Sequence, residues 1–268
     1  IRATLSGTYY GTITASANIT LDSIPRASSV SAANMTMGSA GTISISRASS
    51  AFTHTLTYSF GNTSGTIATK TTATSVSWTP ALSLASQIPN AISGTCTITC
   101  TTYNGNTNIG SKTCTLTLSI PASVKPTISS LTASRIDGEV PSTWGIYVQT
   151  KSKVKLTING AAGSYGSTIK SYSITGGGYS GSASTLTTGF LNNSGTITFK
   201  ATVTDSRGRV SAEASVSITV TAYSPPYFNS SLSQRCLSNG TLDDDGTYIH
   251  ALVSFGYSTC GGKNTLKT

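Results

Sequence analysis

The residues of this chain that are best suited to chemistry are five cysteines, two histidines and eight acids among 268 positions. Cys96 and Cys100 are four residues apart in an alternating stretch, so they face one side of a predicted strand, roughly 13 Å apart. This distance excludes a disulfide between them. Cys114 falls on the next predicted strand. Two alternatives stay open: a disulfide between Cys100 and Cys114, or three buried thiols that pack as small apolar residues.

A metal or disulfide framework is not indicated by the cysteine pattern. Zinc needs two to four convergent ligands, and neither histidine is near these cysteines in the sequence. Cys236 and Cys260 occur in the last segment, and the sequence leaves their state open. An odd cysteine count without regular spacing argues against a disulfide-stapled secreted domain and suits assembly in a reducing cytoplasm.

Catalytic groups are scarce. His54 is predicted just before a strand and His250 within one, and no Gly-x-Ser-x-Gly elbow is found. The acids cluster only at Asp137 with Glu139 and at residues 243–245, and both clusters are typical of turns rather than of paired catalytic carboxylates. We therefore expect no enzyme, and we assign no catalytic, cofactor-binding or metal-binding residue and no cofactor.

Two acidic segments have more specific interpretations. Asp243-Asp244-Asp245-Gly246 is similar to the start of a calcium loop, but the glutamate expected six residues after the glycine is missing. An Asx-rich turn before a strand at 247–249 fits better. Asp205 and Arg207 are expected to form a hairpin turn with local hydrogen bonds.

Lys151, Lys153 and Lys155 alternate with other residues and predict a positive stripe on one strand face. One interpretation is an edge strand that its lysines protect from aggregation. The other is a contact for an acidic glycan or another polyanion. Trp78 and Trp144 could stack on sugars, although core or interface packing is the more ordinary use of such rings.

Composition narrows the possible partners. The net charge is +9, but only 9% of residues are charged and the bases are scattered, which argues against nucleic-acid binding. Attraction to an anionic cell-wall glycopolymer is compatible with this charge. No apolar run reaches the roughly 18–20 residues that span a bilayer, so we expect no membrane insertion. Because the chain begins at Ile1, we expect a piece of a longer or processed polypeptide.

Short runs rich in Thr, Ser, Ile, Val and Tyr, broken by Gly and Asn, favour many strands over helices. Within residues 96–100, 197–203 and 216–220, apolar and polar residues alternate with period two. This pattern predicts strands with one buried and one Thr-rich face. Residues 82–87 are expected to form one helical turn.

The strongest internal pattern is a repeat of about 100 residues, marked by Pro25, Pro126 and Pro226 and close in size to an immunoglobulin sandwich. Residues 93–99 align with 194–200, and 56–60 align with 170–174. The second module therefore carries extra residues around 137–150. The predicted organisation is the last strands of a preceding module (1–24), two complete sandwiches (25–121 and 122–223) and the opening of a further β-rich module (224–268).

Several short strings resemble a family of siphophage tail proteins from phages of Gram-positive bacteria, often labelled minor structural protein. They occupy residues 24–28, 78–85, 165–172, 203–209 and 240–248. The resemblance implies a virion tail or baseplate component built of β-sandwich repeats, and the family carries no catalytic motif that maps onto this chain. A host-binding head would lie outside this chain.

The sequence thus predicts an all-β fold of tandem immunoglobulin-like modules, acting as non-enzymatic spacer or decoration near the host-contact end of a phage tail. The expected partners are other tail proteins in a homo-oligomer, with a trimer as the first guess, and the expected location is the virion tail after assembly in the host cytoplasm. Two alternatives stay open: an adhesion module that binds host cell-wall carbohydrate, and a bacterial surface adhesin stalk.

Overall fold

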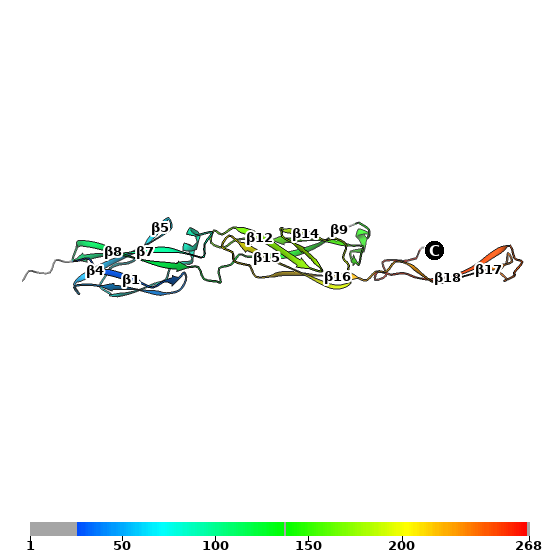
Figure 1. The fold of residues 1–268 in the computed structure, drawn as a ribbon, viewed down its shortest axis with the longest axis horizontal. Coiled ribbons are helices and arrows are strands. Elements are labelled where there is room, and N and C mark those ends of the chain that lie inside the picture. Colours follow the sequence, from blue (N-terminus) through cyan, green and yellow to red (C-terminus); the bar gives the residue numbers. More distant parts are fainter. Residues whose placement is uncertain (1–25, 137, 267–268) are drawn as a thin grey trace, which may run out of the picture. The chain divides into compact units, whose positions relative to one another are not determined.

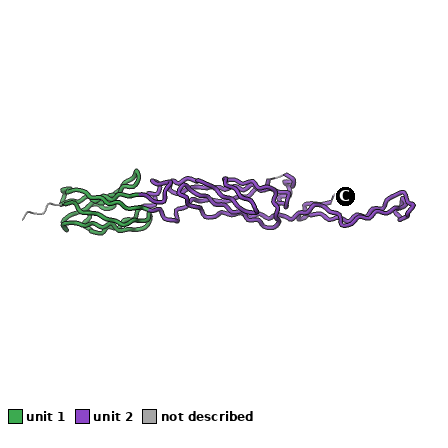
Figure 2. The backbone as a smooth tube through the Cα atoms, viewed as in Figure 1, with its two compact units in different colours: residues 1–80, 95–118 green, residues 81–94, 119–268 purple. Residues whose placement is uncertain are grey.

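The computed structural model describes residues 26–136 and 138–266. These residues fall into two compact units, one of residues 1–80 and 95–118 and the other of residues 81–94 and 119–268 (Figure 2). The predicted module end at 1–24 lies outside the described residues. Within the described part, strands dominate and the helices are two short 3-10 turns. The predicted all-β class is confirmed.

The first unit is built on two sheets (Figure 1). One has the strand order β1-β3-β6, and the other has the order β2-β8-β7-β4-β5. The strands are β1 (Ser29–Ala32), β2 (Met35–Thr36), β3 (Gly41–Ser46), β4 (Phe52–Phe60), β5 (Thr63–Thr71), β6 (Ser75–Trp78), β7 (Ser93–Asn104) and β8 (Thr107–Ser119).

The core of the first unit follows the period-two pattern. Cys96, Ile98 and Cys100 of β7 are 0% exposed, whereas the threonines between them are partly exposed. Leu56 and Phe60 of the neighbouring β4 are buried beside them. The alternation predicted for residues 96–100 is confirmed, because only one face of the strand is covered by the second sheet.

The second unit contains a sandwich of the same kind, with sheets ordered β14-β11-β9 and β10-β16-β15-β12-β13. Its strands are β9 (Ser130–Ile136), β10 (Tyr147–Val148), β11 (Lys153–Asn159), β12 (Ile169–Gly176), β13 (Tyr179–Gly181), β14 (Thr185–Thr187), β15 (Gly195–Asp205) and β16 (Ala214–Thr221). Two 3-10 turns also belong to this unit: η1 (Leu82–Gln87), as predicted, and η2 (Ser142–Trp144).

The two sandwiches repeat one strand order. The run β8-β7-β4-β5 corresponds to β16-β15-β12-β13, and β1-β3-β6 corresponds to β9-β11-β14. This correspondence agrees with the predicted alignment of 93–99 with 194–200. The predicted alignment of 56–60 with 170–174 names the matching strands, β4 and β12, but is four residues out of register, because Leu56 pairs with Cys100 whereas Ile174 pairs with its counterpart Ala201. The extra residues around 137–150 form η2 and β10. The module boundaries at 25–121, 122–223 and 224–268 stay predictions, because compactness alone divides the chain differently.

The second core is an inter-sheet cluster contributed by both sheets. It includes the predicted inward residues of β15 and two of the three predicted in β16, while Val216 is only partly buried. The buried members are Leu131, Val154, Leu156, Ile158, Ile174, Leu191, Ile197, Phe199, Ala201, Val203, Ile218 and Val220.

The last described strands are β17 (Tyr227–Cys236) and β18 (Tyr248–Gly256), which pair only with each other. Nearly every residue of this hairpin is exposed, including large apolar side chains on both strands. After the hairpin, Cys260 packs against Val140 and Val148 of the extra segment, within the same unit.

Candidate functional site

The strand that carries the predicted lysine stripe is central in its sheet. β11 pairs with β14 on one side and with β9 on the other, both antiparallel. The interpretation of these lysines as protection of a sheet edge is therefore wrong, because β11 has no free edge. The sequence could not show this, because strand neighbours depend on the long-range order of the sheet.

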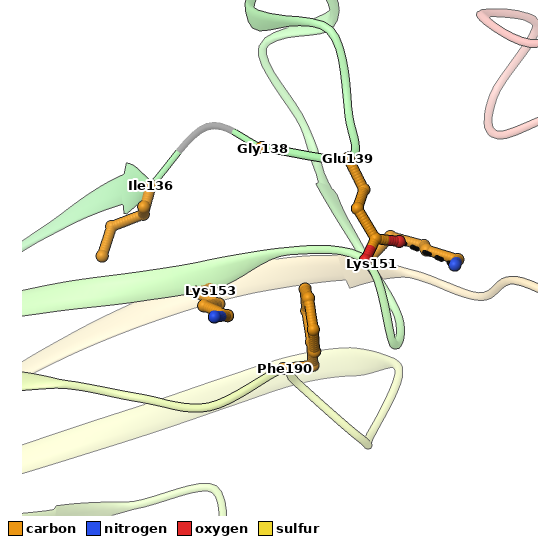
Figure 3. Close-up of a pocket in the computed structure, with 6 residues that line it drawn as sticks. All are labelled: Ile136, Gly138, Glu139, Lys151, Lys153 and Phe190. Atoms are coloured by element: carbon orange, nitrogen blue, oxygen red, sulfur yellow. Dashed lines mark hydrogen bonds and ion pairs between the residues drawn. The ribbon is translucent and has the colours of Figure 1, made fainter.

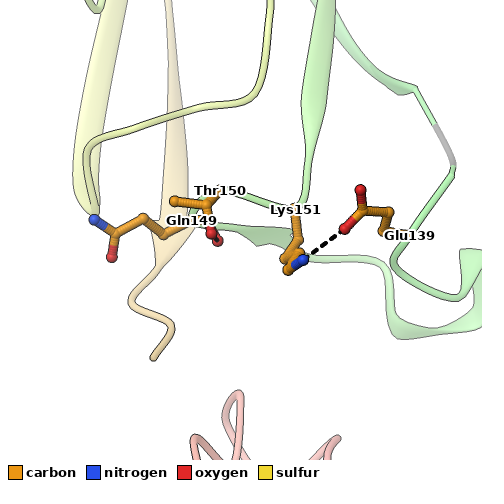
Figure 4. A network of polar contacts seen from close by, with 4 residues as sticks. All are labelled: Glu139, Gln149, Thr150 and Lys151. Carbon is orange, nitrogen blue, oxygen red and sulfur yellow. Dashed lines mark hydrogen bonds and ion pairs between the residues drawn. The ribbon is translucent and has the colours of Figure 1, made fainter. Parts of the chain in front are cut away.

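Lys151 does not belong to the strand face either. It lies in the turn before β11, where Thr150 has a φ of 61°, and its Nζ lies 2.7 Å from Oε2 of Glu139 (Figure 4). This hydrogen bond, with the charge of Glu139, raises the pKa of Lys151. Glu139 comes from the extra segment, so the ion pair fastens that segment to the turn.

The turn around Lys151 is held by the neighbouring Gln149 (Figure 4). The Gln149 side chain donates from Nε2 to the carbonyl of Asn192 at 2.8 Å and accepts from the backbone N–H of Tyr223 at 3.3 Å. Ser152 is buried and its Oγ accepts from the N–H of Val148 at 2.9 Å. The lysine is therefore presented by a fixed turn rather than by a flexible loop.

Lys153 and Lys155 do occupy the outer face of β11. The Nζ of Lys153 lies 4.6 Å from the ring centroid of Phe190, a cation–π contact. Beside it is a pocket of about 160 Å³ lined by Ile136, Gly138, Glu139, Lys151, Lys153 and Phe190 (Figure 3). Lys155 is exposed one step along the strand, opposite Ser134 and Thr187. The predicted stripe is thus two strand-face lysines and one turn lysine bound to a glutamate.

A second pocket of about 270 Å³ also has Glu139 and Lys151 in its lining. It is lined by Glu139, Val140, Trp144, Val148, Lys151, Tyr223, Cys260 and Asn264. Its aromatic, charged and amide groups are of the kinds that bind sugars. Trp144 therefore borders a cavity, whereas Trp78 stacks on Tyr58 with ring centroids 5.1 Å apart.

A cluster of hydrogen bonds surrounds Arg207 in the second unit. The sequence predicted its local turn but not its bonds to distant segments. Asp205 is 0% exposed, and its Oδ1 accepts from the backbone N–H groups of Arg207 (3.0 Å) and Arg209 (2.9 Å), which confirms the predicted local turn. The Arg207 guanidinium, however, donates to four carbonyl oxygens: those of Ala85, Ile88, Ser164 and Tyr165. Burial lowers the pKa of Arg207.

Arg209 plays the same role toward a neighbouring segment. Its guanidinium donates to the carbonyl oxygens of Ile120, Pro121 and Val124. Both arginines therefore bind backbone that is distant in sequence, all within the second unit. Ala85, Tyr165 and Arg207 come from three of the strings that carried the family resemblance, and the structure brings them together.

His54 is a buried structural residue. It lies within β4, not before the strand as predicted, and it is 0% exposed. Its Nε2 lies 2.9 Å from Oγ of Ser28, whose N–H donates to Oγ1 of Thr102 at 2.9 Å. Burial lowers the pKa of His54. Because Ser28 is also buried, this Ser–His pair is closed to a substrate in this structure.

All five cysteines are free thiols, so the Cys100–Cys114 disulfide, which the sequence left open as an alternative, is not formed. Cys96 and Cys100 are buried core residues, and burial raises the pKa of Cys96 to about 11. A thiol with this pKa is a poor nucleophile at neutral pH. Cys236 and Cys260, whose state the sequence left open, are also buried.

The acidic segment at 243–245 forms the predicted Asx turn. Oδ1 of Asp243 accepts from the N–H of Asp245 at 2.9 Å, and its carbonyl accepts from Gly246 at 3.0 Å. Among the described residues, no three His, Cys, Asp or Glu side chains are grouped as metal ligands. The described part of the chain also has no helix with the length and hydropathy of a membrane span.

Several solved structures resemble the chain at low identity. The fibronectin(III)-like modules of Clostridium thermocellum CbhA are 15% identical, with a TM-score of 0.30 over 72% of this chain and 95% of that one. The FN1–FN3 domains of chicken CNTN1 are 9% identical, with a TM-score of 0.27 over 73% and 68%. The chicken interferon gamma receptor alpha chain is 11% identical, with a TM-score of 0.30 over 74% and 99%.

No curated protein matches the chain. A family model does match, over residues 2–242, and its description is "Siphovirus protein of unknown function (DUF859)". This match covers most of the chain and includes both sandwiches and the clustered Ala85, Tyr165 and Arg207. The chain therefore belongs to this siphovirus protein family.

Proposed function

We propose that this chain is a non-enzymatic structural component of a siphophage tail, in which immunoglobulin-like sandwiches act as spacer or decoration near the host-contact end. The observation that carries the proposal is that side chains suited to catalysis are buried and serve the packing and hydrogen bonding of the sandwiches. His54, Asp205 and Arg207 are buried and hydrogen-bonded within sandwich frameworks, and the cysteines at 96 and 100 are core residues. Membership of a siphovirus family supports a phage role.

The repeat of one strand order supports the spacer role. Each sandwich buries its own inter-sheet core, so a protein can be lengthened by repeating the same folded unit. The arginine cluster adds stiffness inside the second unit, because Arg207 and Arg209 tie two connecting segments to the β15–β16 turn. The partners in this proposal are other tail proteins, and the location is the virion tail.

A second candidate is an adhesion module that binds cell-wall carbohydrate. The observation in its favour is the pair of pockets that share Glu139 and Lys151 in their linings, with Trp144, Tyr223 and Phe190 as aromatic walls. Aromatic faces and convergent polar groups are what a sugar-binding site requires. Lys153 and Lys155 would add attraction to an anionic polymer.

One experiment separates the two candidates. The purified chain is incubated with isolated cell walls of a host across a salt series, beside Trp144→Ala, Lys153→Ala/Lys155→Ala and the control Lys112→Ala in the first unit. The spacer proposal predicts no saturable binding, or only weak binding that salt abolishes. Saturable binding at high salt that Trp144→Ala removes and Lys112→Ala retains would contradict it and support the adhesion module.

A further inference from the structure

The β17–β18 hairpin differs from the strands of both sandwiches because it is apolar on both faces. Residues directly opposite each other in an antiparallel pair share a face. One face of β18 carries Ile249, Ala251, Val253 and Phe255 and is called the isoleucine face below. The opposite face carries Tyr248 and Leu252, with Leu232 of β17 directly across from Leu252.

This second surface is called the leucine face and consists of Tyr227, Ser230, Leu232, Gln234, Cys236, Tyr248, His250, Leu252, Ser254 and Gly256. Cys236 is buried, but the tyrosines and leucines are open to solvent: Leu232 is 50% exposed, Leu252 57%, and Tyr227 and Tyr248 56% each. A hairpin of two strands is marginally stable alone in water, so these faces need a cover.

The two sandwiches of this chain show how many faces of a strand are buried in a sandwich. In β3, Ile43 and Ile45 are buried while residues 42, 44 and 46 on the other face are Thr or Ser. In β11, Val154, Leu156 and Ile158 are buried while residues 153, 155 and 157 are Lys or Thr. A sandwich therefore covers one apolar face. A second sheet on the isoleucine face would still leave the leucine face exposed.

We propose that the leucine face is a contact between copies of this chain, in which two copies pack face to face about a two-fold axis. The face is self-complementary. Along the hairpin its order is Tyr227, a serine pair, the Leu232–Leu252 pair, the Gln234–His250 pair and Tyr248. Turning one copy by the two-fold keeps β17 on β17 and β18 on β18. It therefore places leucines on leucines, the serine pair on the Gln–His pair, Tyr227 on Cys236 and Tyr248 on Gly256.

Charge is compatible with this contact. The leucine face contains no Lys, Arg, Asp or Glu, so two copies meet without repulsion between fixed charges. In the antiparallel arrangement, the acidic tip of each hairpin, at residues 243–245, lies away from the acidic tip of the other copy. This arrangement is favoured over a parallel one, which would bring the two acidic tips together.

The size of the face predicts a weak contact. Four half-exposed Tyr and Leu side chains offer roughly 400 Å² per copy, below the roughly 800 Å² per partner of a standard interface. We therefore expect reversible association of the free chain at high micromolar concentration, and a persistent contact where an assembly holds copies together. The proposal does not depend on the proposed tail role.

Sedimentation velocity of the 268-residue chain over a concentration series tests the proposal. The chain is expected to dimerise, and Leu232→Ser/Leu252→Ser is expected to weaken dimerisation by about tenfold or more, because it removes the centre of the contact. The matched control is Ile249→Ser/Val253→Ser on the isoleucine face, which should dimerise as the parent does. A chain that stays monomeric throughout, or two double variants that behave alike, would overturn the proposal.

A second pair of substitutions tests the arrangement without removing apolar surface. Ser230→Asp and Gln234→Lys place an acid and a base at positions that face each other across the two-fold. The combined variant should dimerise more tightly than either single variant at low salt and lose this advantage at high salt. Equal dimerisation of all three variants would overturn the antiparallel contact.

Discussion

Nη2 of Arg207 donates a hydrogen bond to the carbonyl oxygen of Ala85 at 2.8 Å, across 122 residues of sequence. Ala85 is a buried residue of the 3-10 turn η1, and Arg207 is only 7% exposed. The same guanidinium binds Ser164 and Tyr165. One side chain therefore fastens three parts of the second unit together through hydrogen bonds to their backbone carbonyl groups.

Replacing Arg207 should destabilise the second unit strongly. Arg207→Met leaves four carbonyl groups with one partner fewer and leaves the buried Asp205 without its nearby cation, so we expect a loss of about 3 kcal/mol. Urea unfolding followed by circular dichroism measures it. Lys200→Met is the control, because Lys200 forms an exposed ion pair with Glu213 and should change stability by less than about 1 kcal/mol. Equal stabilities of the two variants would contradict this role.

The two faces of β15 should respond differently to truncation. Phe199 is 0% exposed in the second core, so Phe199→Ala should cost about 3–5 kcal/mol. Its neighbour Thr198 faces outward, where its hydroxyl lies 2.9 Å from that of Ser217, so Thr198→Ala should cost about 1 kcal/mol or less. Thermal unfolding of both variants checks the alternation, and a larger loss for Thr198→Ala would contradict the strand orientation.

Stability should fall in mild acid because of His54. Its pKa is lowered by burial and, to a smaller extent, by the positive charge of Arg47, while the interaction with the backbone of Thr71 acts in the other direction. The unfolded chain therefore takes up a proton below pH 6.5, the ordinary value for histidine, while the folded chain does not. Stability is full above this pH and declines as the pH falls toward the lowered pKa.

Denaturant titrations between pH 8 and 5 measure this dependence, since that interval brackets the ordinary histidine pKa. In His54→Gln the decline that begins near pH 6.5 should be reduced relative to the parent chain. His250→Gln, at an exposed position of β18, is the comparison variant. The account of His54 fails if both variants titrate as the parent does.

Thiol reactivity should follow burial. Cys96 is 0% exposed with a pKa raised to about 11 by burial, so the folded chain should resist iodoacetamide at this position at pH 8. Cys114, which is partly exposed on β8, should react first of the three core-strand cysteines. Peptide mass spectrometry after timed labelling measures the order, and labelling of Cys96 as fast as in urea would contradict its buried position.

Local patterns in the sequence predicted the strands and their inner faces well. The alternation at 96–100 and 197–203 and the turn at 82–87 have counterparts in the structure, because each depends on neighbouring residues. The 100-residue repeat indicated the extra residues near 137–150, and the two sandwiches have the same strand order.

Apart from the strand start near His54 and the turn at Lys151, the relationships that failed or were missed are long-range ones. Whether β11 is an edge or a central strand depends on where β9 and β14 lie, and nothing in the alternating lysines records this. The partners of Arg207 are backbone carbonyls, which carry no residue identity. The sequence contains only an indirect signal for this cluster. Ala85, Tyr165 and Arg207 belong to three separate short strings that resemble the same family.

The central proposal is that the chain is a structural part of the phage tail, and immunogold electron microscopy of purified virions tests it most directly. Antibodies raised against the 268-residue chain are applied to intact particles. The proposal predicts label on the tail, concentrated toward the host-contact end. Particles without label, while infected cells contain the protein in soluble form, would contradict it.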